Sequence, residues 1–535
     1  MTATPRWGVA LVGLALAACA QRTAATPPRH PSGSTPAQAL SVDWPQVGGD
    51  LEGQHFSPMR ALDPTNVARL VQRFSVPLGP AGTPEEAYPL EVGGVLYLDT
   101  TGDTVLAVDA TTGRVLWRYT PGPLHPPAWA PLISRGVAVL GNRVFLLTAD
   151  DHLVALDRAS GQPLWSVSVA APRQAYFGSM APLAVDGRVF VGGSGGDEGA
   201  RGFLAAYDAS TGARLWQLYT VPADGQGWMA ALGFHGGGTV WTTPVYDPST
   251  DTLYAGTGNP SPDYFGATRP GPDLYTDCVL AVDASRGTLL WASQEVPHDL
   301  WDYDAASPPL LFPLTQGTGV GEAGKDGYWY PYNAASGTAL DQPVAFVKEG
   351  HSPPTPSGTL EWPGPDGGAN YGPSAYDPGR HLVFVAGING PEKLLGAPTQ
   401  HAQNTPDFGT GQQGVPGAHW TGTITAIDVR SDRIVWQVAT PSPPIGGVLA
   451  TAGGLVVFGQ ENGLLEALDA QTGDQVWQQR QQAPIGTAPL AYRVDGVTYL
   501  AVVTGGAASL QGLFPSQAPG VLQVWSLPPA GTTSH

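Results

Sequence analysis

The chain has 535 residues, a formal net charge of −19, 42% hydrophobic residues and 16 tryptophans. Glycine (71 residues) and proline (53 residues) make up almost a quarter of it, which is typical of a chain with many tight turns around a large core. The negative charge argues against nucleic acid as a partner, because such a chain would not neutralise a phosphate backbone.

The N-terminus predicts export. Arg6 precedes an apolar run at 7–18, which is too short to span a bilayer and is typical of a signal peptide. The run ends in LAAC (16–19), which resembles a bacterial lipobox. We expect residues 1–19 to be a lipoprotein signal, and the lipid on Cys19 to anchor an exported protein to the membrane on the periplasmic side. The alternative is a disulfide between Cys19 and Cys278, the only two cysteines.

Residues 20–41 are rich in proline, alanine, serine and threonine. Such a segment cannot bury enough apolar surface to fold, and we expect it to be a disordered tether. The rest of the chain, residues 42–530, is predicted to be a single domain.

This predicted domain repeats a short pattern. The first copy is AVDATTGRVLW (107–117), and related copies occur at 155–165, 206–216, 281–291, 332–340, 426–436 and 467–477. Each copy predicts a β-hairpin, in which an Asp or Asn caps the turn and a Gly supplies a positive φ. A Trp on the second strand is expected to pack between neighbouring units.

The spacing of the copies predicts the fold class. Successive Asp or Asn anchors are 48, 51, 75, 50, 95 and 41 residues apart, and a period of 40–50 residues matches one four-stranded propeller blade. We assign an insertion to the gap of 75, and expect the gap of 95 to hide a degenerate blade around residues 375–378. The prediction is an all-β, eight-bladed β-propeller of four-stranded antiparallel blades. Residues 521–527 and the region of Val42 are expected to share the closing blade, and a short helix is expected at 66–71.

One stretch contains most of the candidate catalytic side chains. QEVPHDLWDYD (294–304) concentrates carboxylates, a histidine and two aromatic residues in a chain with only 13% charged residues. We predict that Asp302 is a catalytic base. Asp299 and His298 are expected to support the turn that carries it.

Several motifs together resemble the pyrroloquinoline quinone (PQQ)-dependent alcohol and sugar dehydrogenases. The most specific are GTGNP (256–260) and HDLWDYD (298–304), supported by RPGPDLY (269–275) and the segment 445–463. The resemblance covers almost all of residues 43–512. It implies an eight-bladed propeller with the quinone in a central funnel. The repeat alone is not specific, because the scaffold propellers of outer-membrane assembly carry it too.

The resemblance implies a metal site for Ca²⁺ or a lanthanide. Its expected ligands are Asp197, Asn259, Asp302 and Asp304. Asp197 stands where the family has a glutamate, so the adjacent Glu198 is an alternative ligand. Asp304 matches an acidic position that supports lanthanide binding in some members, but it also occurs in members that use Ca²⁺.

The resemblance also implies a PQQ site. Lys325 matches a cation that contacts the quinone oxygens, and Trp241 matches the indole on which the quinone stacks. Further expected cofactor contacts are Glu86, Arg135, Ser179, Ser194, Gly195, Gly196, Thr239 and Asn370. Two further positions depart from the family. Trp129-Ala130 replaces an adjacent cysteine pair and could cap the quinone, and Ile445 replaces a tryptophan that alcohol-oxidising members often have, which suggests a different substrate cavity.

The implied activity is oxidation of an alcohol, polyol or sugar hydroxyl by hydride transfer to PQQ. Asp302 would take the hydroxyl proton, and Lys325 would stabilise charge on the quinone. The sequence has no C-x-x-C-H haem motif, so electrons would pass to an external acceptor, a cytochrome or the quinone pool. The alternative is a non-enzymatic propeller lipoprotein that acts as an assembly scaffold or binding protein.

Overall fold

The computed structural model describes residues 41–170, 175–222, 236–399 and 406–528. The chain divides into two units, Met1–Ala39 and Leu40–His535, and every described residue belongs to the second. The described part is almost entirely β-structure, with three 3-10 helices: η1 (Val67–Arg69), η2 (Gly196–Glu198) and η3 (Gly266–Thr268). Within these ranges, no helix is long and apolar enough to cross a membrane.

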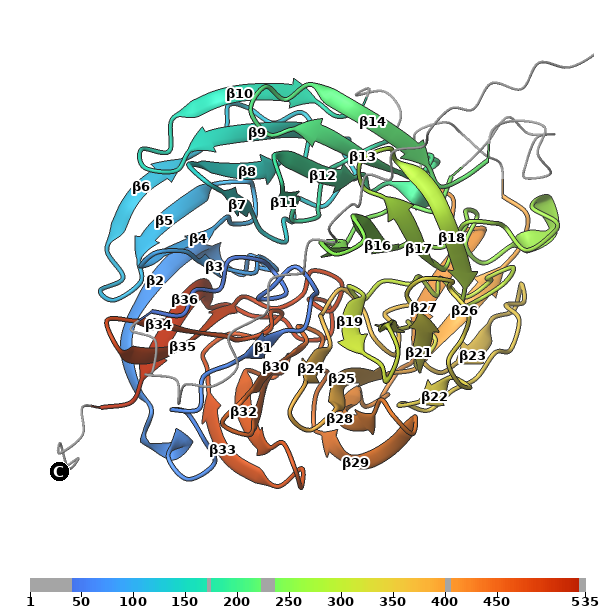
Figure 1. Ribbon diagram of the computed structural model, residues 1–535. Helices are drawn as coiled ribbons and strands as arrows, with labels where there is room; N and C mark the ends of the chain where they lie inside the picture. Colours follow the sequence, from blue (N-terminus) through green and yellow to red (C-terminus); the bar gives the residue numbers. More distant parts are fainter. Residues whose placement is uncertain (1–40, 171–174, 223–235, 400–405, 529–535) are drawn as a thin grey trace, which may run out of the picture. The chain divides into compact units, whose positions relative to one another are not determined.

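Eight antiparallel sheets follow one another around a centre, as Figure 1 shows. They confirm the predicted eight-bladed propeller. The first four blades are β3–β6 (Leu90–Glu91, Val95–Leu98, Val105–Asp109, Val115–Tyr119), β7–β10 (Ala138–Leu140, Arg143–Leu147, His152–Asp157, Pro163–Ser168), β11–β14 (Leu183–Val185, Arg188–Gly192, Phe203–Asp208, Arg214–Tyr219) and β15–β18 (Val245–Asp247, Thr252–Gly256, Cys278–Asp283, Thr288–Gln294).

The other four blades complete the ring. They are β19–β22 (Leu310–Pro313, Thr318–Ala323, Tyr328–Asn333, Val344–Ala345), then β24, β25, β28 and β29 (Ala375–Asp377, Leu382–Asn389, Thr421–Asp428, Arg433–Thr440), then β30–β33 (Val448–Thr451, Leu455–Gly459, Leu464–Asp469, Gln475–Arg480), and finally β34–β36 (Leu490–Val494, Val497–Thr504, Pro519–Ser526) with β2 (Val71–Ala81). A short strand, β1 (Phe56–Ser57), pairs in parallel with β30.

The repeated hairpins join neighbouring blades. In the first copy, Asp109 accepts hydrogen bonds from two turn amides at 3.0 Å, and Gly113 has a φ of +75°. Trp117 donates to the carbonyl of Arg158 in the next blade at 2.9 Å, and its ring covers Gly161, where a Cβ would lie only 2.5 Å away. The same Trp-on-Gly contact recurs at Trp165–Gly212, Trp216–Gly287, Trp291–Gly337 and Trp436–Gly473. The Trp of one repeat and the Gly of the next are therefore two halves of one inter-blade contact.

The predicted degenerate blade is wrong. Ala375–Asp377 is strand β24, and it belongs to the same blade as the repeat copy at 426–436. The 95-residue gap instead contains an accessory sheet outside the eight blades, formed by β23 (Thr359–Glu361), β26 (Glu392–Gly396) and β27 (Thr410–Gly414).

The eighth blade is the closing one, and it lacks the repeat for a physical reason. Its third strand, β36, comes from the C-terminal end and its fourth, β2, from the N-terminal end, so no turn joins them. Phe74 of β2 packs on Gly113, where five of the other blades use a Trp. The role of 521–527 is confirmed, but its N-terminal partner is β2, while Val42 makes an isolated bridge to Arg493 of β34. The helix expected at 66–71 is reduced to η1.

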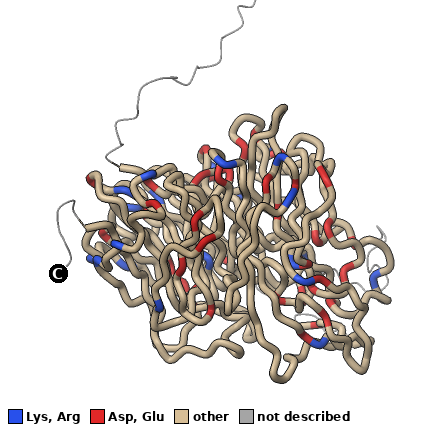
Figure 2. The backbone as a smooth tube through the Cα atoms, turned by 90° about the horizontal axis from the view of Figure 1, so that it is seen from below, with Lys and Arg blue, Asp and Glu red and all other residues tan. Residues whose placement is uncertain are grey.

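The N-terminal segment 51–55 also forms hydrogen bonds with the inner strands of the ring. Backbone carbonyls of this segment accept hydrogen bonds from the inner strands of four consecutive blades, in the pairs Leu51–Tyr246 (2.7 Å), Glu52–Leu311 (2.8 Å), Gln54–Tyr376 (2.8 Å) and His55–Ala450 (3.1 Å). Basic residues are few and interspersed with acidic ones along the backbone (Figure 2). Cys278 is a free thiol buried in β17, and Cys19 lies outside the described residues.

Candidate active site

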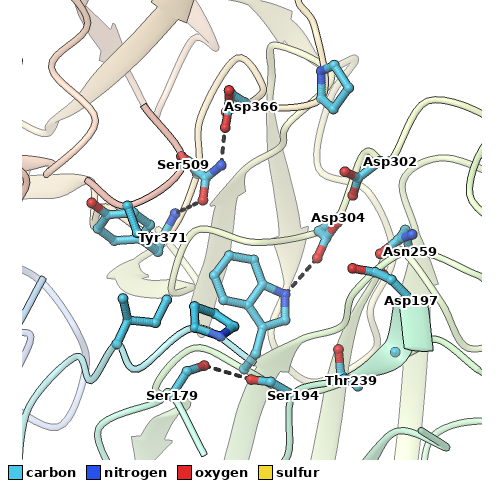
Figure 3. A pocket seen from close by; sticks show the side chains of 18 of the residues that line it. Ser179, Ser194, Asp197, Thr239, Asn259, Asp302, Asp304, Asp366, Tyr371 and Ser509 are labelled. Carbon is cyan, nitrogen blue, oxygen red and sulfur yellow. Dashed lines mark hydrogen bonds between the residues drawn. The ribbon is translucent and has the colours of Figure 1, made fainter. Parts of the chain in front are cut away.

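One cavity of about 720 Å³ is lined by every residue that the sequence predicted for the metal, the cofactor and catalysis. Each of these residues precedes the first strand of a blade or follows its second strand. In an antiparallel blade, the start of the first strand and the end of the second strand lie at the same end of the blade. Loops from the first six blades therefore meet at one end of the ring. Figure 3 shows Asp197, Asn259, Asp302 and Asp304 gathered on one side of this cavity.

Lys325 lies between two of the carboxylates. Its Nζ atom is 2.8 Å from Oδ1 of Asp302 and 3.0 Å from Oδ1 of Asp304. The other oxygen of Asp304 accepts a hydrogen bond from Nε1 of Trp241 at 2.6 Å (Figure 3). The proposed base, its counter-charge and the predicted indole floor therefore form one connected group.

The carboxylates repel one another. Burial, with a contribution from Asp304, raises the pKa of Asp197 to about 6, although Lys325 and a hydrogen bond with Asn259 lower it. Burial and its acidic neighbours also raise the pKa of Asp302 well above its usual range, despite Lys325. Burial alone would lower the pKa of Lys325, but Asp302 and Asp304 outweigh it and raise this pKa. One ammonium does not balance three carboxylates, so this group favours a further cation.

A short glycine loop places Asp197. Gly195 and Gly199 flank η2 with φ values of +103° and +96°, a region that favours glycine. The carbonyl of Asp197 accepts hydrogen bonds from the amide of Asp407 at 2.9 Å and the hydroxyl of Ser261 at 3.3 Å. The neighbouring Glu198 also lines the cavity, and burial, with repulsion from Asp197, raises its pKa to about 8.

The turn that carries Asp302 is held by its neighbours. Asp302 has a φ of +64°, a left-handed conformation that costs a non-glycine residue about 1–3 kcal/mol. The carboxylate of Asp299 accepts hydrogen bonds from the amides of Trp301 and Tyr303, both at 3.0 Å. His298 lies 3.3 Å from Asp273 through Nδ1. Asp299 thus supports the turn from inside the loop, in line with the expectation from the sequence.

Arg135 provides a second cation. Its guanidinium lies 2.8 Å from Glu86 and donates to Ser179 at 3.1 Å. It also lies between the rings of Trp241 and Tyr371, at 4.7 Å and 4.6 Å from their centroids. The rings and Glu86 fix the orientation of this guanidinium in the cavity wall.

The other predicted cofactor contacts line the same cavity. Ser179 and Ser194 share a hydrogen bond of 2.6 Å between their hydroxyls. The amide group of Asn370 is used locally, since it donates to the carbonyl of Asp366 at 2.9 Å and accepts from the amide of Tyr371 at 2.8 Å. The remaining predicted contacts, which line the wall, are Gly195, Gly196 and Thr239.

The sequence did not identify part of the wall. The additional lining residues are Pro131, Ile133, Phe177, Pro365, Asp366, Tyr371, Phe408, Gly411, Gln412, Ala508 and Ser509. Asp366 and Tyr371 flank the predicted Asn370 and could have been inferred from it. Phe408 precedes β27 of the accessory sheet and Gln412 lies in that strand, where no repeat pattern pointed to them.

Two of the departures from the family pattern, Trp129 and Ile445, lie outside the cavity lining. Neither Trp129 nor Ile445 is among the described lining residues, so the suggested aromatic cap is not observed. Trp129 packs edge-on against Phe177, with the ring centroids 5.8 Å apart. Ile445 is buried in the cluster that contains Tyr371. Both residues therefore shape the cavity through the residues they support.

The donor chemistry of the site fits the groups expected there. Carboxylate and amide oxygens are the ligands that Ca²⁺ and similar hard cations prefer. Two cations and an indole suit a flat, carboxylate-bearing cofactor. In the described part of the chain, no three His, Cys, Asp or Glu side chains converge to hold a metal as they stand. A metal bound here would therefore use the amide oxygen of Asn259 beside the carboxylates.

Comparisons with known proteins agree with this site. The family model for the glucose/ethanol/alcohol dehydrogenase β-propeller domain matches residues 44–349, and that for the outer membrane protein assembly factor BamB matches residues 421–513. The quinohemoprotein alcohol dehydrogenase ADH IIB of Pseudomonas putida is 32% identical over 527 residues, covering 90% of this chain and 76% of the relative. The quinoprotein alcohol dehydrogenase PedH of the same species is 31% identical over 519 residues, covering 87% of each chain.

The solved structures show the same relationship. A europium-containing methanol dehydrogenase superposes with a TM-score of 0.79 at 25% identity, covering 91% of this chain and 98% of that one. The quinohemoprotein alcohol dehydrogenase of Comamonas testosteroni gives a TM-score of 0.82 at 26% identity, covering 92% and 81%. The extent of the family match and the identity to ADH IIB show that this chain belongs to the PQQ-dependent glucose/ethanol/alcohol dehydrogenase family of β-propellers.

Proposed function

We propose that this protein is a PQQ-dependent dehydrogenase that oxidises the hydroxyl group of an alcohol, polyol or sugar and passes the electrons to an external acceptor. One observation carries the proposal. Loops from three consecutive blades bring Asp197, Trp241, Asn259, Asp302 and Lys325 into one cavity, and Lys325 contacts the proposed base. The quinoprotein and quinohemoprotein alcohol dehydrogenases among the relatives support an alcohol as the substrate class.

We assign the metal site to Asp197, Asn259, Asp302 and Asp304. Their oxygens suit Ca²⁺ or a lanthanide, and the similarity to a europium-containing enzyme supports either choice. Asp197 is favoured over Glu198 because it interacts with Asn259 and Asp304. A bound cation would compete with Lys325 for Asp302 and Asp304, which would free the ammonium to face the cofactor.

We assign the cofactor site to the two cations and the indole. Arg135, held by Glu86 and the rings of Trp241 and Tyr371, is ready to bind a carboxylate. Lys325 would face the quinone oxygens, and Trp241 would support the plane of the ring system. The remaining contacts would come from Ser179, Ser194, Gly195, Gly196, Thr239 and Asn370.

The chain itself supplies the proton chemistry. PQQ, when bound, would supply the acceptor for a hydride from the substrate carbon. A carboxylate oxygen of Asp302 accepts the hydroxyl proton, a role that typically contributes about 10²–10⁴-fold to the rate. Lys325 stabilises negative charge that develops beside it, because the cavity holds it at low solvent exposure.

A scaffold or binding protein is disfavoured. The match to the assembly-factor model is limited to residues 421–513, outside the loops that carry the metal and base residues. A scaffold has no need for a buried ammonium between two aspartates, because such a group is costly to desolvate.

We further propose that the protein is exported and held at the membrane by a lipid on Cys19. The support is the apolar run at 7–18 followed by LAAC (16–19). These residues lie outside the described part of the chain.

Reconstitution tests the proposed activity. The purified protein, freed of cofactor, is mixed with PQQ and either Ca²⁺ or La³⁺, and reduction of an artificial dye is measured across alcohols, polyols and sugars. We expect dye reduction to require PQQ and one of the cations. Absence of PQQ binding with either cation would exclude the dehydrogenase and leave the binding or scaffold function.

A further inference from the structure

Arg269 is completely buried between loops that carry site residues, yet it does not line the cavity. It caps η3, in the long connection between β16 and β17. Burying a guanidinium is costly unless its N–H groups are paired, so the partners of this side chain indicate its role.

Four of the five N–H groups of Arg269 donate hydrogen bonds to residues of the surrounding loops. Nε donates to the carbonyl of Pro262 at 3.1 Å, and Nη2 donates to that of Asp263 at 3.1 Å. Nη2 also donates to the carbonyl of Asp299, and Nη1 pairs with the carboxylate of Asp273. Asp273 neutralises the charge, while the three carbonyl contacts join two separate loops.

Each joined loop carries a residue of the proposed site. Pro262 and Asp263 follow the metal ligand Asn259 by three and four residues. Asp299 precedes the base Asp302 by three residues, and its carboxylate holds the amides on both sides of that base. The left-handed φ of +64° at Asp302 is unfavourable by itself, so this turn needs such support.

We propose that Arg269 is a positioning residue that fixes the metal-ligand loop of Asn259 relative to the turn of Asp302. This rests on the proposed function, because it assumes that both residues serve one site. A planar fork with donors pointing in several directions is required, since a lysine ammonium at the same place cannot reach carbonyls on both loops and Asp273. Charge neutralisation alone would not need the contact with Asp299.

The test uses Arg269→Lys, which keeps the charge and removes the fork. Hydrogen–deuterium exchange is measured on the protein without cofactor, and Ca²⁺ binding is measured by calorimetry. We expect faster exchange in both loops, 259–263 and 299–304, and Ca²⁺ affinity weakened about 10–100-fold, as for other residues that orient metal ligands. In the reconstituted enzyme kcat should fall about tenfold or more while KM for the alcohol changes little.

Arg493→Lys is the matched control. Arg493 is also a buried arginine, but it lies in β34 of the closing blade and contacts Thr498. This variant should lose comparable thermal stability, with exchange in the two loops, Ca²⁺ affinity and kcat unchanged. The comparison separates positioning of the site from general support of the fold.

The outcomes separate the two proposals. Unchanged exchange in the two loops of Arg269→Lys, or Ca²⁺ affinity and kcat within about threefold of wild type, overturns the positioning role. If the wild-type protein binds neither Ca²⁺ nor PQQ, the proposed function fails, while exchange still reports whether Arg269 couples the loops. If Arg269→Lys does not fold, Arg269→Gln replaces it, and unchanged exchange in the two loops together with wild-type Ca²⁺ affinity and kcat in that variant overturns the proposal.

Discussion

The ammonium nitrogen of Lys325 lies 2.8 Å from a carboxylate oxygen of Asp302. Asp302 precedes β19 and Lys325 follows β20. One blade therefore holds the proposed base and its counter-charge at the same end of its strands. This contact makes Asp302 the obvious first residue to test.

Asp302→Asn should abolish turnover and leave the fold intact. The amide has almost the same shape but cannot accept the substrate proton, so kcat should fall about 10²–10⁴-fold. Steady-state dye reduction with PQQ and Ca²⁺ measures this. Asp157→Asn is the control, because Asp157 only caps a surface turn through Ser160. Retained wild-type turnover in Asp302→Asn would falsify the assignment of the base.

Trp241 should have two separable roles. Trp241→Phe keeps a ring but loses the hydrogen bond to Asp304, so Ca²⁺ affinity should weaken about tenfold while PQQ still binds. Trp241→Ala should weaken PQQ binding as well, because it removes the aromatic surface. Calorimetry with Ca²⁺ and fluorescence titration with PQQ measure the two effects. Equal PQQ affinity in Trp241→Ala and wild type would contradict the stacking role.

The Trp-on-Gly contact can be tested with two glycines of similar backbone. Gly161 and Gly187 have φ values of +71° and +76°, so alanine is strained at both. A Cβ on Gly161 would lie 2.5 Å from the ring of Trp117, but nothing lies within 4 Å at Gly187. Gly161→Ala should therefore lower the free energy of unfolding by about 1–3 kcal/mol more than Gly187→Ala in urea denaturation. Equal losses would show that the inter-blade contact does not resist the added methyl group.

Stability should fall as the pH rises. Burial, together with repulsion from Asp43, raises the pKa of Glu91 from near 4.5 to about 8. The folded state therefore holds this proton more tightly than the unfolded state, so its stabilising effect is full below about pH 4.5 and is lost towards pH 8. Glu91→Gln stays neutral, so its free energy of unfolding should exceed that of wild type at pH 8.5 and nearly equal it at pH 5. A variant with an unchanged pH slope in urea denaturation would argue against a protonated Glu91.

Cys19→Ser should release the protein from the membrane fraction. The lipid is the only membrane attachment that the sequence predicts, so the variant should appear in the soluble periplasmic fraction. Immunoblotting of cell fractions and the mass of the mature N-terminal peptide measure this. A variant that remains in the membrane fraction would show that attachment does not depend on this cysteine.

The blade count was predictable because each repeat contains its own turn chemistry. Asp109, Gly113 and Trp117 define one hairpin and its neighbour contact within a short stretch, so counting copies nearly counts the blades. The N-terminal strand of the closing blade was misassigned because β36 and β2 meet from opposite ends of the chain, with no turn between them to mark the pair. The accessory sheet was not predicted because it lies outside the eight blades and contains no copy of the repeat.

The residues of the candidate site likewise fall into those that the sequence identified and those that only the structure revealed. Asn259, Asp302 and Lys325 stand in distinctive motifs, and the resemblance of these motifs to the family implied their roles. Phe408 and Gln412 line the cavity from β27 of the accessory sheet and the residues before it, which no repeat pattern marks.

The sequence by itself determined the repeat, the propeller class and the residues that carry the proposed chemistry, because each of these depends on a short run of neighbouring residues. Only the tertiary structure decided which ends close the ring, that Lys325 lies between Asp302 and Asp304, and that Arg269 joins two site loops. These relationships join residues far apart in the chain, and closing the ring is what brings them within hydrogen-bonding distance.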